Sequence, residues 1–233
     1  MDYSVVIPVY NERDNLEILL QSLTEVMDSL VKGYEVICVN DGSRDGSDEV
    51  LKAMKRRYEQ LRVVEFERNY GLTAALDAGL SMAKGDIVIT MDADMQNDPK
   101  DIPKLLKEIG DYDVVCGVRS RRHDPWLRIV SSRIANYIRN RVTKEHIVDV
   151  GCTLRAYKRK FLSGLKLFDG MHRFLPTLLK WEGAKVVEVE VEHHPRLYGK
   201  TKFGVWNRVF KAFIDLLAVV WMKERRLNYK IKE

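Results

Sequence analysis

The stretch SVVIPVYNE, residues 4–12, joins an apolar run to a polar turn, and this junction decides the fold. Apart from its serine, the run 4–9 is apolar on both faces and rich in valine and isoleucine, which is typical of a strand buried in a parallel sheet. Helical periodicity follows at 15–30, and the alternation continues along the chain. Further strands are predicted at 34–39, 61–65, 86–91 and 113–117, with helices at 47–58, 72–83 and 99–109 between them.

This alternation predicts an α/β fold, a mixed and mostly parallel Rossmann-like sheet with helices on both faces. Residues 1–118 would form its doubly wound core. Asn15 and Asp98 are predicted to cap the helices that they precede or begin. Later in the chain, the sequence predicts strands at 152–157 and 185–192 and a helix near 171–181.

Charge is distributed unevenly along the chain. The 233 residues carry a net charge of +5, from 39 Lys and Arg against 34 Asp and Glu. Two basic zones, 119–144 and 196–233, together hold 18 of the bases and four of the acids, so the remainder is acidic. The zones predict anionic partners, while the acidic body and the lack of a DNA- or RNA-binding motif disfavour nucleic acid. An apolar content of 45% excludes a disordered chain.

The cysteines and the N-terminus indicate where the protein is expected to be located in the cell. Cys38, Cys116 and Cys152 lie far apart in apolar runs, without the spacing of a disulfide framework or a zinc site. We expect reduced core thiols in a cytoplasmic protein. No basic region precedes the first apolar run, so no signal peptide is expected. The longest apolar run, 216–222, is far shorter than the ~20 residues that span a bilayer.

Polar clusters follow three of the predicted strands. They are YNE at 10–12, NDGS at 40–43 and DADMQ at 92–96. Each alone is an ordinary turn sequence. Because parallel strands present their carboxyl ends at one edge, where such sheets bind ligands, the three together predict a functional site there.

The side chains of these clusters suit a nucleotide and a divalent cation. Asp92 and Asp94, with the amide of Gln96 nearby, offer the hard oxygen ligands that Mg²⁺ or Mn²⁺ prefer, and nothing here suits zinc. Asp41 accepts hydrogen bonds, as from a ribose hydroxyl or a base N–H. Tyr10 offers an aromatic face to a base, and the nearby proline is expected to stiffen the loop. Neither a GxGxxG nor a GxxxxGK[ST] motif is present, which disfavours a dinucleotide oxidoreductase and a P-loop NTPase.

Several motifs occur in a specific order. They are IPVYNE at 7–12, NDGSRDGS at 40–47, RNYGLTAAL at 68–76, DADMQ at 92–96 and VCGVR at 115–119, followed by DVGC at 149–152, HRFLP at 172–176 and RLYGKTKF at 196–203. This series resembles the inverting glycosyltransferases of family 2, which have the GT-A fold. The later motifs are most similar to the polyprenyl-phosphate branch, which includes dolichyl-phosphate mannose synthases and undecaprenyl-phosphate glycosyltransferases. The likeness covers essentially the whole chain.

The resemblance implies a role for each matching residue. Nucleotide binding falls to Pro8, Tyr10, Glu12, Asp41 and Asp92; metal binding to Asp92, Asp94 and Gln96; and the acceptor phosphate to Arg119, Ser132, Arg133, Arg196 and Lys202. The catalytic residues implied are Asp94, Arg119 and Asp149. Arginine suits these places because its fork pairs bidentately with phosphate oxygens.

The implied reaction is metal-dependent, inverting transfer of a hexose from a nucleoside-diphosphate sugar to dolichyl or undecaprenyl phosphate. The donor would be of the GDP-mannose or UDP-glucose type, and the cofactor Mg²⁺ or Mn²⁺. A phosphomonoester has its second pKa near ~6, so the acceptor is largely ionised at neutral pH without a strong base. Asp149 is expected to position the sugar or the acceptor, or to act as a base.

Two other functions fit parts of the pattern. A family 2 transferase that uses a saccharide or another hydroxyl acceptor is the main alternative, although the QxxRW motif of processive synthases is absent. A non-catalytic module that binds membranes or nucleic acid is the other, and the intact DADMQ cluster disfavours it.

The chain is predicted to divide into a transferase domain at 1–202 and an amphipathic, basic segment at 203–233. Polar residues in the first part of that segment recur every three or four positions, which predicts a helix. The helix could pack on the sheet. The resemblance favours an interfacial helix on the cytoplasmic face of the membrane, with or without a membrane-anchoring subunit.

Overall fold

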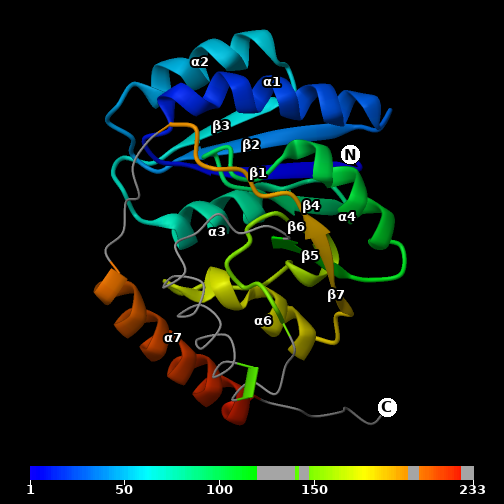
Figure 1. The fold of residues 1–233 in the computed structure, drawn as a ribbon, viewed down its shortest axis with the longest axis vertical. Helices are drawn as coiled ribbons and strands as arrows, with labels where there is room; N and C mark the ends of the chain where they lie inside the picture. The colour runs from blue at the N-terminus through cyan, green and yellow to red at the C-terminus, as the bar shows by residue number, and fades with distance from the viewer. Residues whose placement is uncertain (120–139, 142–146, 199–204, 227–233) are drawn as a thin grey trace.

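The computed structural model describes residues 1–119, 140–141, 147–198 and 205–226, with side chains from residue 213 onward in the last range. Within these ranges one seven-stranded sheet has the order β3-β2-β1-β4-β6-β5-β7 (Figure 1). Each strand is parallel to its neighbours except β6, which runs antiparallel to both β4 and β5. The strands are β1 (Tyr3–Val9), β2 (Tyr34–Asn40), β3 (Leu61–Glu65), β4 (Ile87–Thr90), β5 (Val114–Arg119), β6 (Arg155–Lys158) and β7 (Val186–Val191).

Helices cover both faces of the sheet. The α-helices are α1 (Arg13–Ser29), α2 (Ser47–Arg57), α3 (Leu72–Met82), α4 (Ile102–Glu108), α6 (Leu175–Trp181) and α7 (Val205–Arg225), and the 3₁₀ helices are η1 (Pro99–Asp101), η2 (Arg159–Phe161) and η3 (Met171–Phe174). Side chains alternate along β1: Val5 and Ile7 pack against α1, α2 and α4, while Val6 packs against α3 on the opposite face. The predicted α/β fold with a mostly parallel sheet is therefore confirmed.

Two predictions about helix starts had different outcomes. Asp98 caps η1 as expected, because its Oδ1 accepts a hydrogen bond from the Lys100 N–H at 2.9 Å. The prediction that Asn15 caps α1 was wrong. The helix begins at Arg13, whose N–H donates to Asp45 in the loop after β2, and Asn15 is buried inside the first turn. An acceptor from a distant loop thus starts the helix earlier than the local sequence indicates.

Because β6 is antiparallel, the loop before it lies at the edge of the sheet where the parallel strands end. Arg155 at the start of β6 stands in register with Thr90 of β4 and Cys116 of β5. The segment that precedes β6, 147–154, therefore lies beside the carboxyl ends of these two parallel strands. Cys38, Cys116 and Cys152 are buried and form no disulfide with one another, which is consistent with core thiols.

The described side chains of the last helix pack on other helices. Leu216 and Val219 of α7 contact the cluster formed by η3 and α6, and Asp215 forms an ion pair with Arg173 at 3.5 Å. Figure 1 shows α7 at the opposite end of the molecule from α1 and α2. No helix in the described part of the chain has the length and apolar character needed to cross a bilayer.

Candidate active site

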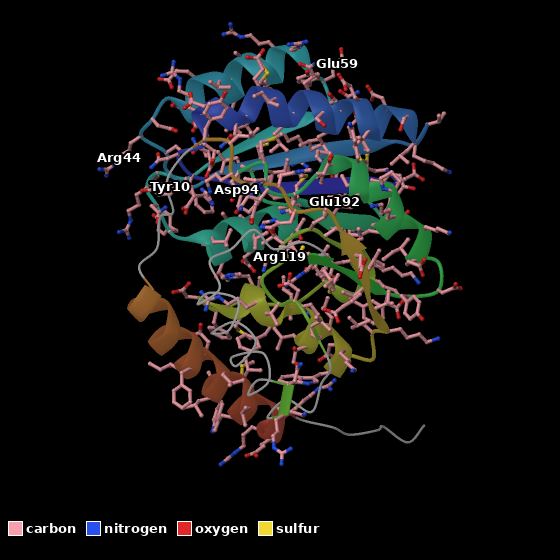
Figure 2. All side chains as sticks on the ribbon, viewed as in Figure 1. Tyr10, Arg44, Glu59, Asp94, Arg119 and Glu192 are labelled. Atoms are coloured by element: carbon pink, nitrogen blue, oxygen red, sulfur yellow. The ribbon has the colours of Figure 1, made fainter. Side chains whose placement is uncertain are left out.

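The two carboxylates that follow β4 form the centre of the candidate site. Asp94 is 7% exposed, and its Oδ1 accepts a hydrogen bond from the Gln96 N–H at 3.1 Å. Met95 between them has a φ of 61°, a left-handed conformation that is uncommon for a residue with a side chain. This tight turn folds the chain back on Asp94 and holds the carboxylate in place. Figure 2 labels Asp94 near Tyr10, at the edge where β1 and β4 end.

The environment of these carboxylates favours a cation. Burial, followed by the charge of Asp94, raises the pKa of Asp92 to about 7. Two nearby carboxylates repel each other, so a positive group between them lowers the energy of the ionised pair. In the structure Arg196 supplies positive charge here: its Nη2 donates to Asp94 Oδ2 at 2.6 Å, its Nη1 lies 3.7 Å from Glu12 Oε1, and its charge acts to lower the pKa of Asp92. The donor set therefore fits a divalent cation.

Substrate would have to complete such a metal site. In the ranges that the structure describes, no group of three or more His, Cys, Asp or Glu side chains is placed to hold a metal ion. Mg²⁺ commonly binds through one or two carboxylates together with substrate phosphates. The contacts shown for Gln96 are made by its backbone, since its carbonyl accepts from the His194 N–H at 3.0 Å. That bond also holds the segment that carries Arg196.

Asp41 at the end of β2 organises a loop of the chain itself. Its carboxylate accepts hydrogen bonds from Asn69 Nδ2 at 2.9 Å and from the backbone N–H groups of Tyr70 and Gly71 at 2.6 and 2.9 Å. A Cβ added to Gly42, which has a φ of +65°, would lie 2.4 Å from backbone atoms of this loop. Asp41 therefore orders residues 69–71, and its assignment to the nucleotide remains a prediction.

The other predicted nucleotide residues lie around the end of β1. Pro8 stands inside β1 in register with Val39, so the expectation that it stiffens a loop was wrong. Glu12 is 8% exposed, and its Oε2 accepts from Asn15 Nδ2 at 2.7 Å. Tyr10 is partly buried just beyond the strand. The ends of β1, β2 and β4 are thus brought together as predicted, since β1 pairs with both of the other strands.

A second arginine–carboxylate pair stands at the end of β5. Arg119 donates from Nε to Asp149 Oδ2 at 2.7 Å and from Nη2 to Oδ1 at 2.8 Å. Asp149 is 1% exposed and also accepts from the Gly151 N–H at 3.1 Å. Both carboxylate oxygens are therefore engaged by the chain, which fits a positioning role better than a role as base. Figure 2 labels Arg119 beside β5, away from Tyr10.

Some predicted residues fall outside the described part of the chain. Ser132, Arg133 and Lys202 are among them, so their assignment to the acceptor phosphate remains a prediction. Arg196 was also assigned to that phosphate; in the structure it contacts Asp94, and the assignment remains a prediction.

Sequence reasoning missed several contacts that hold the site. Asn69 belongs to a quoted motif, yet nothing in its spacing indicated a bond to Asp41. His172 Nδ1 lies 2.7 Å from Thr73 Oγ1 at the start of α3. Burial is the main cause that lowers the pKa of His172 to about 3, so this histidine is neutral near pH 7. The HRFLP motif was the one signal that singled it out.

Comparison with known proteins agrees with this geometry. The family model described as "Glycosyl transferase family 2" matches residues 4–165. An undecaprenyl-phosphate 4-deoxy-4-formamido-L-arabinose transferase from Aeromonas hydrophila is 41% identical over 226 residues, covering 96% of this chain and 69% of that protein. A dodecaprenyl-phosphate galacturonate synthase from Rhizobium johnstonii is 37% identical over 238 residues, covering 100% of this chain and 69% of that protein.

Solved structures share the fold at low sequence identity. Glucosyl-3-phosphoglycerate synthase from Mycobacterium tuberculosis, in complex with Mn²⁺, UDP and phosphoglyceric acid, superposes with a TM-score of 0.72 and 19% identity, covering 98% of this chain and 80% of that one. A mannosyltransferase from Pyrobaculum calidifontis, in complex with GDP-Man and Mn²⁺, has a TM-score of 0.66 and 22% identity, covering 97% and 65%. The family match and the curated relatives together show that the chain belongs to the polyprenyl-phosphate branch of the family 2 glycosyltransferases and has their GT-A fold.

Proposed function

We propose that this glycosyltransferase transfers a sugar, with inversion, from a nucleoside-diphosphate sugar to a polyprenyl phosphate, and that it needs Mg²⁺ or Mn²⁺. One observation carries the proposal. A pair of carboxylates after β4 and two arginines, Arg119 and Arg196, lie at the same edge of the sheet. Such an edge can hold two anions, the donor diphosphate and the acceptor phosphate. The names of the two curated relatives support the acceptor class.

The carboxylates of Asp92 and Asp94 would hold the divalent cation, together with oxygens of the donor diphosphate. When bound, the cation supplies Lewis-acid stabilisation of the leaving diphosphate. Asp94 must exchange its contact with Arg196 for this role. The guanidinium so released carries a positive charge at the same edge, where it can pair with a phosphate.

Arg119 would hold the acceptor phosphate in line with the sugar. Its Nε and Nη2 pair with Asp149, so Nη1 lies on the opposite edge of the guanidinium. Fixing two anions in reacting geometry contributes up to ~7–11 kcal/mol in well-oriented cases.

The state of the carboxylates favours a phosphate over a hydroxyl as the acceptor. A hydroxyl acceptor needs a positioned general base. The oxygens of Asp149 accept from Arg119 and Gly151, and those of Asp94 accept from Arg196 and Gln96. A phosphate is already largely ionised at neutral pH, so a site in which these bases are engaged can still act on it.

A transfer assay tests the proposal. Labelled GDP-mannose, UDP-glucose, a UDP-uronic acid and a UDP-4-formamido-pentose are each incubated with undecaprenyl or dolichyl phosphate and Mn²⁺, because the names of the relatives widen the range of sugars beyond hexoses. We expect labelled lipid from one donor, inverted at the anomeric carbon by NMR, and its loss with EDTA. Transfer to free saccharides but not to the lipid phosphate would support the alternative acceptor class.

We further propose that α7 lies on a membrane surface. Its outer face carries large apolar side chains that are 49–61% exposed, and basic residues follow at its end. The outer face consists of Phe213, Ile214, Leu217 and Trp221, and the basic end of Lys223, Arg225 and Arg226. An exposed apolar stripe beside basic residues is the pattern of helices that bind anionic lipid interfaces.

A vesicle sedimentation experiment tests this surface. The Leu217→Glu/Trp221→Glu variant is compared with Val31→Glu/Met82→Glu, which adds the same charge at exposed apolar residues of other helices and turns. We expect the first variant to lose binding to vesicles that contain phosphatidylglycerol and the second to keep it. Equal binding by both variants would remove the membrane role of α7.

A further inference from the structure

Glu188 of β7 holds the loop that carries Asp149. Its Oε1 accepts hydrogen bonds from the Val148 N–H at 2.9 Å and the Asp149 N–H at 3.1 Å. Its Oε2 accepts from the same Val148 N–H at 3.0 Å. One carboxylate thus serves two consecutive backbone donors, and bonds to a charged acceptor are stronger than bonds between neutral groups.

These contacts close a ring of bonded elements around Arg119. Strand β7 pairs with β5, in register from Val114↔Val186 to Arg119↔Val191. From the end of β5, Arg119 reaches Asp149, and from Asp149 the backbone returns to β7 through Glu188. Because β5 and β7 are paired in the sheet, the position of the Arg119 guanidinium depends on its bonds to Asp149 and on the bonds from that loop to Glu188.

Gly151 limits the guanidinium on its other side. A Cβ at this position would lie 2.7 Å from Arg119 Nη2, closer than real contacts allow. The Gly151 N–H also donates to Asp149 Oδ1. The loop therefore approaches Arg119 closely from one side while Asp149 pairs with it edge to edge.

We propose that Glu188 is a positioning residue, which holds Arg119 through Asp149 in the orientation that meets the acceptor phosphate. This inference rests on the proposed function, because it takes Arg119 as the residue that binds phosphate. It distinguishes Glu188 from the other glutamate of its strand, Glu190. Glu190 is exposed on the same side of β7, because side chains two residues apart along a strand share a face.

Two substitutions separate the role of Glu188 from a general effect on the sheet. Glu188→Gln keeps the shape of the side chain but offers one acceptor oxygen in place of two, and Glu190→Gln is the matched control. Steady-state kinetics are measured with the polyprenyl phosphate as the varied substrate, together with the Kd of Mn²⁺–nucleotide. We expect Glu188→Gln to lower kcat/KM for the acceptor about 5–20-fold, because small misplacements of a positioning group cost up to about 10²-fold, with the nucleotide Kd unchanged.

Gly151→Ala displaces the same guanidinium from the opposite side and supplies a second readout. We expect a similar loss for the acceptor, and a double variant with Glu188→Gln that is less impaired than the product of the two single effects, since both act on Arg119. Wild-type kinetics for Glu188→Gln, fully additive effects, or an equal loss of nucleotide affinity would each overturn the proposal. A Glu188→Gln chain that fails to fold would also overturn it, because Glu188 would then be structural.

A measurement without substrate separates this inference from the proposed function. The Nε–H resonance of Arg119 is identified by its loss in Arg119→Lys. We expect it to shift or broaden in Glu188→Gln and to stay unchanged in Glu190→Gln. An unchanged resonance in both would overturn the positioning role, whereas a wild-type protein without transfer to polyprenyl phosphate would defeat only the proposed function.

Discussion

Two arginine–carboxylate pairs stand at the same edge of the sheet, and they are built differently. Arg119 begins on a strand, pairs edge to edge with Asp149 through two short bonds, and buries that carboxylate almost completely. Arg196 comes from the segment after β7, and its one short bond to Asp94 leaves its side chain 26% exposed. We therefore propose that the first pair is a fixed part of the fold, while a metal cation can replace Arg196 in the second.

The surroundings of Arg196 support this difference. A cavity of about 480 Å³ lies beside its segment, between α1 and the turn after β4. Its lining includes Ile18, Met95, Pro99, Pro195 and Leu197. A side chain that leaves Asp94 therefore has space next to it, whereas a Cβ on Gly151 would already touch Arg119.

The largest expected effect comes from removing the Asp94 carboxylate, which contacts Arg196 and which we propose as a metal ligand. Asp94→Asn should lower transfer by about 10³-fold or more, because the loss of Lewis-acid stabilisation costs several kcal/mol. The measurement is initial rate at saturating Mn²⁺. Asp86→Asn is the control, since that side chain is 83% exposed near the opposite ends of the strands. Substantial transfer by a folded Asp94→Asn chain would contradict the metal assignment.

Replacing each arginine by methionine should separate the pairs by their contribution to folding. Arg119→Met leaves Asp149 buried without its partner, which costs about 3–5 kcal/mol and lowers the unfolding temperature by about 6–20 °C for a chain of this size. Arg196→Met should cost less, because the Arg196 side chain is 26% exposed against 16% for Arg119, and Asp94 keeps its hydrogen bond from the Gln96 N–H. Thermal unfolding followed by circular dichroism gives both values. Equal shifts would mean that the two pairs do not differ as described.

The smallest expected effect is a gain in affinity for Mn²⁺. Since we propose that Arg196 and a metal cation compete for Asp94, Arg196→Met should bind Mn²⁺ about 2–5-fold more tightly in the absence of substrates, a factor of the size that one ion pair provides. Arg119→Met should leave this Kd unchanged. Isothermal titration calorimetry measures both. Weaker Mn²⁺ binding by Arg196→Met would show that the arginine assists the metal site rather than competing with it.

The fold could be predicted from the sequence because its signals are local. The run 4–9 is apolar on both faces apart from its serine, and the observed strands differ from the predicted ones by at most three residues at an end. The direction of β6 carries no such signal, because a short apolar run reads the same whether the strand is parallel or antiparallel.

The residues of the candidate site could also be identified from the sequence, but the side chains that they contact could not. Asp94 and Asp149 stand in short motifs, while their arginines lie 102 and 30 residues away. Glu188 bonds to a loop 40 residues earlier, and in sequence it differs in nothing from Glu190. Such pairings depend on the order of the strands, which composition and periodicity do not contain.

The separation of Asp94 from Arg196 has a consequence for the order of events during synthesis. The two residues are 102 positions apart, and a ribosome adds about 5–20 residues per second, so the arginine is made about 5–20 s after the carboxylate. The strands that bring Glu12 and Asp94 together, β1 and β4, are complete before then. During that interval Asp94 and Glu12 exist without their arginine partner, so any charge that offsets them has to come from ions in solution.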